Sequence, residues 1–292
     1  MNYILMNDFS LKQYNTLKIE SIAKNMIFPF NGSGIKEVYE EFSKEKEIVI
    51  IGKGSNILLS QEYYDESYIF MNLKLMDTLD YSDNQIFAEA GCTLSSISWF
   101  ALENNIKGLE FIEDIPGSLG GAIIMNAGTY EDTIGQLVKE ITYYDISANE
   151  IKTVQTMSDN FGRRDSIWSN NNYIIISCSL VGMHGDYELS LEKMLEIKKK
   201  RYTKQPRNYP NAGSVFKRPS LNGKDYFVWK LFDETGLRGM KRNDAMISDK
   251  HPGFIVNLGK AKYDDIKFLI DLAIKRVKDN YNIDLQLEWK II

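Results

Sequence analysis

Alternating apolar and polar residues predict strands along much of the chain. The run 17–23, LKIESIA, alternates near the N-terminus and is interpreted as a short strand, and Ile48 to Ile51 form an apolar run typical of a buried strand. The text from Tyr68 to Ala90 is also strand-like, with a polar turn at residues 82–85. Three further β-rich runs favour antiparallel strands: 138–144, 151–154 and 173–180. Because strands and helices do not alternate regularly, the pattern predicts an α+β fold rather than βαβ winding.

Apolar residues at helical spacing predict helices in both halves of the chain. Ser33 and Thr93 are the expected N-caps of two of them, and a third runs from Leu189 to about Arg201. Gly236 ends a fourth, and a fifth lies near the C-terminus. The expected inward residues include, helix by helix, Val38 and Phe42; Leu94, Ile97 and Ala101; Leu191, Met194 and Leu195; and Ile266, Leu269, Ile270, Ala273, Val277 and Tyr281. The closing run 284–292 alternates like a strand, in which an acid such as Glu288 most often faces solvent.

Composition and charge narrow the function classes. With 43% hydrophobic and 26% charged residues among 292, the chain is an ordinary globular protein long enough for two domains. Its net charge of −5 argues against nucleic-acid binding, which needs a concentrated basic face. Cys92 and Cys178 are isolated and no run resembles a signal peptide or a membrane span, so we expect a cytoplasmic protein without disulfides, metal or membrane association.

A loop with two glycines follows the strand at 48–51. Gly52, Lys53, Gly54, Ser55 and Asn56 break the strand, and such a loop makes an anion-binding concavity of the kind that holds a pyrophosphate. The spacing matches neither a Walker loop nor a Rossmann fingerprint. By itself the pattern is weak, because a simple hairpin explains it about as well.

Glycines also gather between Glu113 and Tyr130, in the stretch EDIPGSLGGAIIMNAGTY. Glycine lets the backbone approach a ligand closely, and Ser118 and Asn126 supply polar groups that a cofactor edge would need. The alternative is a tight crossover between two strands.

Two other segments carry candidate chemistry. Arg163 and Arg164 lie in a predicted turn, where the default is a solvated surface and the alternative is recognition of a carboxylate by a guanidinium. The basic run 198–207 suits a helix C-terminus and could also receive a diphosphate. Gly213 leaves the Ser214 hydroxyl on an open backbone near cations; without a nearby histidine, a Ser-His-Asp hydrolase is a poor interpretation.

Taken in order, these motifs resemble the MurB family, the UDP-N-acetylenolpyruvoylglucosamine reductases. The resemblance extends over nearly the whole chain, from Asn15 to Glu288. The motifs that carry it are GKGSNILLS, IPGSLGGA, MNAG, RDS, NAGSVFKRP and SDKHPGFIVN. The resemblance implies an enzyme that uses FAD and NADPH to reduce the enolpyruvyl ether of a UDP-sugar in peptidoglycan synthesis. It also implies a two-lobed FAD-binding domain of the VAO/PCMH type followed by an α+β substrate-binding domain. A shift in composition around 184–188 places the boundary between them, so that the domains are expected at 1–186, with the lobe boundary near 75–80, and at 187–292.

The resemblance further implies roles for individual residues. Residues 52–56 would hold the FAD pyrophosphate, and the flavin would be lined by Ile115, Pro116, Gly117, Ser118, Gly121, Asn126 and Gly128. Arg164 would bind the substrate carboxylate, Ser214 would deliver a proton, and Glu288 would assist that delivery. The cations expected to meet the UDP phosphates are Lys204, Lys217 and Arg218.

Some positions depart from the family pattern. Arg163 stands where members usually carry Tyr, and the segment after Tyr130 lacks a usual Gly. The short spacing before the second domain resembles the type II form of the family. Two alternatives follow: a flavin-dependent oxidoreductase of another nucleotide sugar, and a catalytically silent flavin- or nucleotide-binding protein. A monomer is the favoured oligomeric state.

Overall fold

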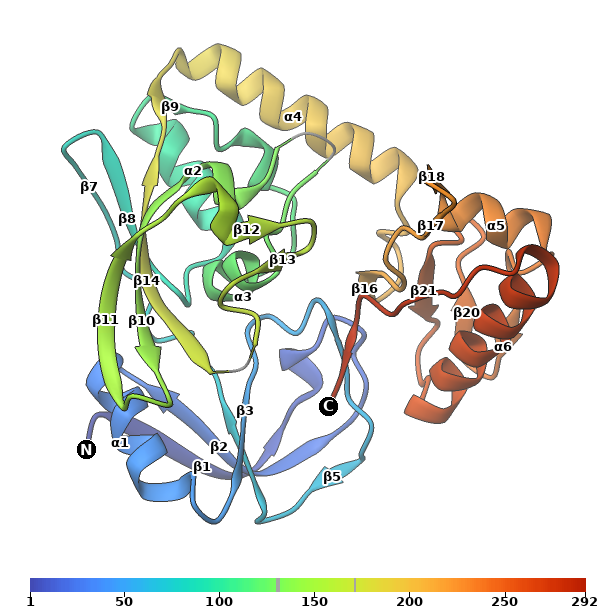
Figure 1. Ribbon diagram of the computed structural model, residues 1–292, viewed down its shortest axis with the longest axis horizontal. Helices are drawn as coiled ribbons and strands as arrows, with labels where there is room; N and C mark the ends of the chain where they lie inside the picture. Colours follow the sequence, from blue (N-terminus) through green and yellow to red (C-terminus); the bar gives the residue numbers. More distant parts are fainter. Residues whose placement is uncertain (130–131, 171) are drawn as a thin grey trace. The chain divides into compact units, whose positions relative to one another are not determined.

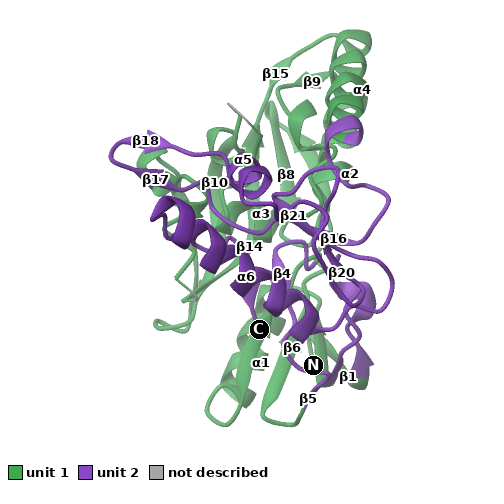
Figure 2. Ribbon diagram, turned by 90° about the vertical axis from the view of Figure 1, so that its right-hand side faces the viewer, with its two compact units in different colours: residues 1–8, 24–53, 65–201 green, residues 9–23, 54–64, 202–292 purple. Residues whose placement is uncertain are grey.

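The computed structural model describes residues 1–129, 132–170 and 172–292, so Tyr130 lies outside the described residues. The chain forms two compact units, coloured separately in Figure 2. The first contains residues 1–8, 24–53 and 65–201, and the second contains 9–23, 54–64 and 202–292. Each unit is therefore assembled from segments that are far apart in sequence. The division of the chain at residue 186 into an FAD-binding and a substrate-binding domain stays a prediction, because the compactness of a unit does not show which of its segments bind a ligand.

Two five-stranded sheets provide the framework around the first unit (Figure 1). In one, β6 pairs in parallel with β2 and β3. The other has the order β11-β10-β14-β8-β7, and its strands pair antiparallel, as the sequence predicted. The strands are β1 Tyr3–Ser10, β2 Ile22–Pro29, β3 Glu47–Ile50, β5 Tyr63–Tyr64, β6 Tyr68–Met71, β7 Leu79–Ser82, β8 Gln85–Glu89, β10 Val138–Asp145, β11 Glu150–Gln155 and β14 Tyr173–Val181. Two short pairs complete the unit: β9 Ile106–Lys107 with β15 Met183–His184, and β12 Phe161–Gly162 with β13 Asp165–Ser166.

Helices cover these sheets through their apolar faces. Helix α3, Leu119–Ile124, packs against β14 and β8, and α1, Gly32–Phe42, packs against β10. Helix α2 spans Leu94–Glu103, and α4 spans Tyr187–Lys204. The 3₁₀ turns are η1 Lys12–Tyr14, η2 Glu110–Ile112, η3 Ile134–Gln136 and η4 Ser158–Asn160.

The structure confirms some predicted helix details and corrects others. Thr93 caps α2, because its hydroxyl accepts the amide of Ser96 at 3.0 Å. Ser33 is not the cap of α1; the cap is Asn31, two positions earlier in the chain, whose side chain accepts the Gly34 amide at 3.0 Å. In α4 Met194 is buried, but Leu195 is 53% exposed, since only a narrow face of this long helix is covered.

The second unit has an antiparallel sheet of order β16-β21-β20-β19 with α6 against it. Its elements are β16 Asn211–Ser214, β19 Lys241–Arg242, β20 Ala245–Ile247, β21 Phe254–Asn257, α5 Val228–Glu234 and α6 Tyr263–Tyr281. Short pairs join β17 Ser220–Leu221 to β18 Lys224–Asp225, and β4 Ile57–Leu58 to β22 Lys290–Ile291. As predicted, α6 buries Ile266, Leu269, Ile270, Ala273 and Val277.

Two predicted strands are wrong in extent. The run 17–20 is a turn and loop, and β2 begins only at Ile22, because the buried side chain of Asn15 bonds the Ile19 main chain and closes a local loop. The closing run 284–292 contributes only β22. None of the described helices combines the length and apolarity that a membrane span requires.

Candidate active site

In the first unit, the loop after β3 contacts the start of α3. A Cβ added to Gly52 would collide with the hydroxyl of Ser118, so a larger residue there would require the Ser118 side chain to move. The side-chain amide of Asn72 donates to the carbonyls of Ile51 and Gly52, at 2.8 and 2.9 Å, and holds the loop in place. Two residues predicted for the cofactor, Gly52 and Ser118, are thus neighbours. Asn72 is an anchor that the sequence motifs did not reveal.

Part of the glycine content of the predicted flavin stretch serves packing. A Cβ on Gly120 would lie 3.2 Å from the Cβ of Ala90, and the Gly120 amide bonds the Ala90 carbonyl at 3.0 Å. Gly121 has only the Ser118 hydroxyl near, at 3.7 Å from an added Cβ. The glycine at 120 therefore brings α3 close to the strands, and Gly121 stays a candidate for ligand approach. Ile115 and Pro116 precede this helix, with Gly117 directly before Ser118.

Asn126 is buried and in the left-handed region, with φ of 41°. Its side chain donates to the Gly162 carbonyl at 2.8 Å and accepts the Gly135 amide at 3.0 Å. The amide therefore joins three segments of the protein. A cofactor contact of Asn126 stays a prediction.

The hairpin of β12 and β13 carries Arg164 at its turn. Phe161 and Trp168 pack with ring centroids 5.6 Å apart, and Trp168 is buried in the core, so the base of the hairpin is fixed. At the turn, Arg164 has φ of 55° and its guanidinium donates to the Gly128 carbonyl at 3.1 Å. The structure thereby brings the predicted carboxylate-binding residue to the predicted flavin-lining loop within one unit.

A row of ion pairs holds α4 to the segment before that loop. The pairs are Lys193 with Glu110 at 3.2 Å, Lys198 with Glu113 at 2.8 Å, and Arg201 with Asp114 at 3.0 Å. Burial alone would raise the pKa of Glu110, but amide hydrogen bonds from its own residue and Gly108, together with the Lys193 charge, leave that pKa below its ordinary value. The acidic members are all nearly fully buried, so the row fixes the residues that lead into Ile115.

In the second unit, Gly54 is held in a conformation that suits glycine. Its φ is +64°, its carbonyl accepts the Thr16 amide at 3.0 Å, and an added Cβ would collide with the Tyr14 carbonyl. The loop therefore continues from Gly52 and Lys53, assigned to the first unit, into Gly54, Ser55 and Asn56 of the second.

Ser214 and Glu288 lie on neighbouring segments of the second unit. Ser214 ends β16 and is exposed, after Gly213 with φ of +76°. The next residue, Val215, accepts the Glu288 amide through its carbonyl at 2.9 Å. Ser214 and Glu288 are far apart in the sequence of the second unit, and this antiparallel contact brings their main chains together. The third predicted catalytic residue, Arg164, belongs to the first unit.

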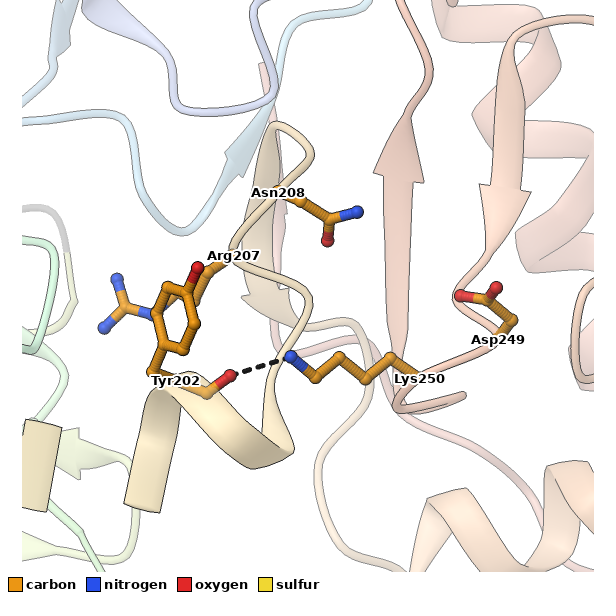
Figure 3. A pocket seen from close by; sticks show the side chains of 5 residues that line it. All are labelled: Tyr202, Arg207, Asn208, Asp249 and Lys250. Atoms are coloured by element: carbon orange, nitrogen blue, oxygen red, sulfur yellow. Dashed lines mark hydrogen bonds between the residues drawn. The ribbon is translucent and has the colours of Figure 1, made fainter. Parts of the chain in front are cut away.

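A polar cavity of about 440 Å³ lies in the second unit, lined by Tyr202, Arg207, Asn208, Asp249 and Lys250 (Figure 3). Lys250 donates to the Tyr202 carbonyl at 2.7 Å, and its ammonium group stands 5.5 Å from the Tyr202 ring centroid. Two cations against one acid favour an anionic ligand. The basic run 198–207 of the sequence, which includes Tyr202 and Arg207, predicted an anion-binding role for this part of the cavity. Lys250 belongs to the SDKHPG motif, and the sequence alone did not indicate that it lines the cavity.

The three cations predicted for the UDP phosphates are all exposed. Lys204 ends α4, and Lys217 donates its main-chain amide to the Gln286 carbonyl at 2.8 Å. The guanidinium of Arg218 stacks over the Phe227 ring at 4.4 Å. Their phosphate contacts stay predictions.

Comparison with known proteins agrees with these features. The model of an FAD binding domain matches residues 24–149, and that of the UDP-N-acetylenolpyruvoylglucosamine reductase C-terminal domain matches residues 205–292. The reductase of Pseudothermotoga lettingae is 36% identical, over 97% of this chain and 96% of its own. That of Petrotoga mobilis is 33% identical, over 98% of this chain and 95% of its own. The crystal structure of MurB from Thermus caldophilus superimposes with a TM-score of 0.80 at 27% identity, covering 100% of this chain and 99% of that one.

The expected fold class is confirmed: an FAD-binding domain of the VAO/PCMH type is followed by the C-terminal domain of the reductases, in an α+β structure. The identities hold over nearly the full length of both chains, so the match does not rest on a shared cofactor domain alone. The chain belongs to the family of UDP-N-acetylenolpyruvoylglucosamine reductases.

Proposed function

We propose that this chain uses FAD and NADPH to reduce the enolpyruvyl group of UDP-N-acetylglucosamine enolpyruvate. The product is UDP-N-acetylmuramate, a precursor of peptidoglycan. The structural observation that carries the proposal is the pairing of the Ser214 and Glu288 segments, because it brings the main chains of a serine and a glutamate together. Such a pair suits proton delivery to a carbon atom.

The residues present fit FAD. Gly52 and Gly54 occupy positions where an added Cβ would collide with the protein, so the loop takes a close-packed course that depends on glycine. Loops of this kind bind phosphate oxygens through main-chain amides. FAD, when bound, supplies the redox chemistry by accepting hydride from NADPH and passing it on. We assign the pyrophosphate to residues 52–56, and the flavin to the residues named above between Ile115 and Gly128.

The chain's own residues would then act on the substrate. Hydride addition to the β-carbon of the enolpyruvyl group leaves negative charge on the α-carbon and its carboxylate. Arg164 binds and orients that carboxylate, because a guanidinium forms paired hydrogen bonds with it. Ser214 delivers the proton to the α-carbon, and Glu288 assists by polarising the hydroxyl or restoring its proton. Serine is a weak acid, so this assistance is needed.

The diphosphate of the substrate needs cations on the second unit. Lys204, Lys217 and Arg218 are exposed there, and the cavity beside Arg207 and Lys250 is large enough for part of a nucleotide. We assign the UDP group to these residues, with 187–292 as the substrate-binding domain and 1–186 as the FAD-binding domain.

We further propose that the protein works in the cytoplasm as a monomer. Both of its cysteines are buried free thiols, and such thiols are typical of a reducing compartment. Sedimentation of the purified protein with FAD bound tests the oligomeric state; a concentration-dependent mass would contradict a monomer.

The spectrum of the purified protein tests the reaction. We expect flavin absorbance that NADPH bleaches and that the enolpyruvyl substrate restores. Ser214→Ala is expected to slow the restoring step much more than the bleaching step; equal loss in both steps would show that Ser214 has another role.

One departure from the family pattern favours testing other acceptors. Arg163 is exposed beside Arg164 and adds charge where members usually carry Tyr. A panel of nucleotide sugars should therefore be compared as oxidants of the reduced enzyme. Faster reoxidation by a different nucleotide sugar would identify that sugar as the preferred substrate. Bleaching by NADPH without reoxidation by any of these sugars would indicate a flavoprotein with another function.

A further inference from the structure

The side chain of Asn56 extends a short parallel ladder. In the pairing of β4 with β22, the Asn56 carbonyl accepts the Lys290 amide at 3.0 Å. A regular parallel ladder would next use the Asn56 main-chain amide to bond the Glu288 carbonyl. Here the side-chain amide bonds that carbonyl, with Nδ2 donating to it at 3.0 Å. Asn56 therefore contacts the main chain on both sides of Trp289, which is buried.

The opposite edge of the same peptide segment is fixed as well. The Glu288 amide donates to the Val215 carbonyl at 2.9 Å, and the Val215 amide donates to the Gly253 carbonyl at 3.0 Å. A row of hydrogen bonds thus runs from Asn56 through Glu288 and Val215 to Gly253, the residue before β21. Ser214 immediately precedes Val215 in this row. A shift of the Glu288 main chain would therefore change the distance between the proposed proton donor and its assisting carboxylate.

We infer that Asn56 is a positioning residue for the step in which the substrate is reduced and the flavin is reoxidised. Its side-chain amide holds the Glu288 main chain in place beside the Ser214 segment. The inference rests on the proposed function, in which those two residues deliver the proton. Asparagine suits the task because its amide both reaches the carbonyl and donates to it. An aspartate of the same shape cannot donate when ionised.

The decisive variant is Asn56→Asp, compared with Asn25→Asp. Asn25 is a matched control, since its Nδ2 also donates to a strand carbonyl, that of Tyr68, at 3.1 Å. In stopped-flow measurements, we expect Asn56→Asp to slow flavin reoxidation by the enolpyruvyl substrate about 10- to 100-fold more than flavin reduction by NADPH, because a small misplacement of reacting groups has effects of this size. Asn25→Asp should change the ratio of the two rates by less than about twofold.

A double-mutant cycle with Glu288→Gln tests whether Asn56 acts through Glu288. If it does, Asn56→Asp slows reoxidation by less than about threefold in the Glu288→Gln background. Effects that multiply fully would overturn the inference. Amide hydrogen exchange gives a readout that needs no activity: the peptide covering 284–292 should exchange faster in apo Asn56→Asp than in apo Asn25→Asp.

The outcomes separate this inference from the proposed function. A wild-type protein that NADPH does not bleach, or that the enolpyruvyl substrate does not reoxidise, contradicts the proposed function itself. A wild type that performs both steps, with Asn56→Asp reoxidised at the wild-type rate, contradicts only the inference. The pyrophosphate assignment of residues 52–56 rests on main-chain amides, which Asn56→Asp leaves in place, so the variant should fold and retain FAD. Loss of either would overturn the inference, because the side chain of Asn56 would then be a structural or cofactor group.

Discussion

The guanidinium of Arg164 donates to the carbonyl of Gly128 at 3.1 Å. This bond ties the turn of the 161–166 hairpin to the glycine-rich stretch, and the hairpin is held to residues 124–126 of that stretch twice more. Asn126 donates to the Gly162 carbonyl at 2.8 Å, and the Ser166 hydroxyl donates to the Ile124 carbonyl at 3.1 Å. The orientation of Arg164 therefore depends on the loop that is assigned to the flavin.

Replacing Arg164 by lysine keeps the charge and removes the planar fork. We expect reoxidation by the substrate to slow about 100-fold, because a single ammonium group cannot bond both the Gly128 carbonyl and two carboxylate oxygens in fixed geometry. Stopped-flow measurement of the oxidative step provides the test. Arg163→Lys, at the exposed neighbour, serves as the control and should stay within about threefold of the wild type. A wild-type rate in Arg164→Lys would show that only charge matters there.

Gly54→Ala tests the loop that enters the second unit. The left-handed conformation alone costs an alanine roughly 1–2 kcal/mol, and the added Cβ would also collide with the Tyr14 carbonyl. Gly223→Ala is a matched control, since Gly223 has φ of +74° and nothing lies within 4 Å of an added Cβ. Urea unfolding should show a clearly larger loss for Gly54→Ala, together with reduced FAD content. Equal losses would mean that the loop relaxes around the methyl group.

Glu110→Gln tests the ion pairs that hold α4. The Glu110 side chain is 5% exposed and accepts bonds from the Gly108 amide, the Ser190 hydroxyl and Lys193. We expect a loss of about 1–3 kcal/mol in the free energy of unfolding at pH 7, since hydrogen bonds to a buried charge are lost. Glu196→Gln, in an exposed pair with Lys200 on the same helix, should change the free energy of unfolding far less, because water screens a solvent-exposed ion pair.

The pH dependence of that difference has a definite sign. The pKa of Glu110 in the folded protein lies below its ordinary value of 4.5. Its stabilising contribution is therefore present above pH 4.5 and is lost as the pH falls through the folded pKa. Urea unfolding at pH 7 and near pH 4 should show the gap between wild type and Glu110→Gln closing at the lower pH. A gap that widens on acidification would contradict this assignment.

His251 is expected to make the protein less stable in mild acid. Burial lowers the pKa of its imidazole below the ordinary 6.5, and its Nδ1 accepts the Gly253 amide at 3.2 Å, which requires an unprotonated nitrogen. The unfolded chain therefore binds the proton first, and stability falls as the pH drops from 6.5 through the folded pKa. His251→Asn should reduce the decline in unfolding free energy between pH 7.5 and 5.5. His184→Asn controls for removing an exposed histidine, and identical slopes for wild type and His251→Asn would contradict the prediction.

The sequence by itself determined the elements whose patterns are local. Periods of two and of about 3.6 residues identified the antiparallel strands 138–144, 151–154 and 173–180 and the inward face of α6, because one side of each must be covered by apolar neighbours. The ordered motifs indicated the family and, with it, FAD. Sequence patterns gave the wrong extent for the strand at 17–23 and the wrong cap for α1. The side chains of Asn15 and Asn31 make local hydrogen bonds that hydrophobic periodicity does not reveal.

Only the tertiary structure decided which distant residues meet. Ser214 and Glu288 become neighbours through one antiparallel contact, and Asn56 reaches Glu288 across 232 positions of sequence. Such contacts depend on the geometry of a folded sheet, where the partner of a peptide group is set by register and not by spacing along the chain. The composition of a loop can therefore indicate that it binds a ligand. The hydrogen bonds that orient the reacting side chains form only once distant segments have paired.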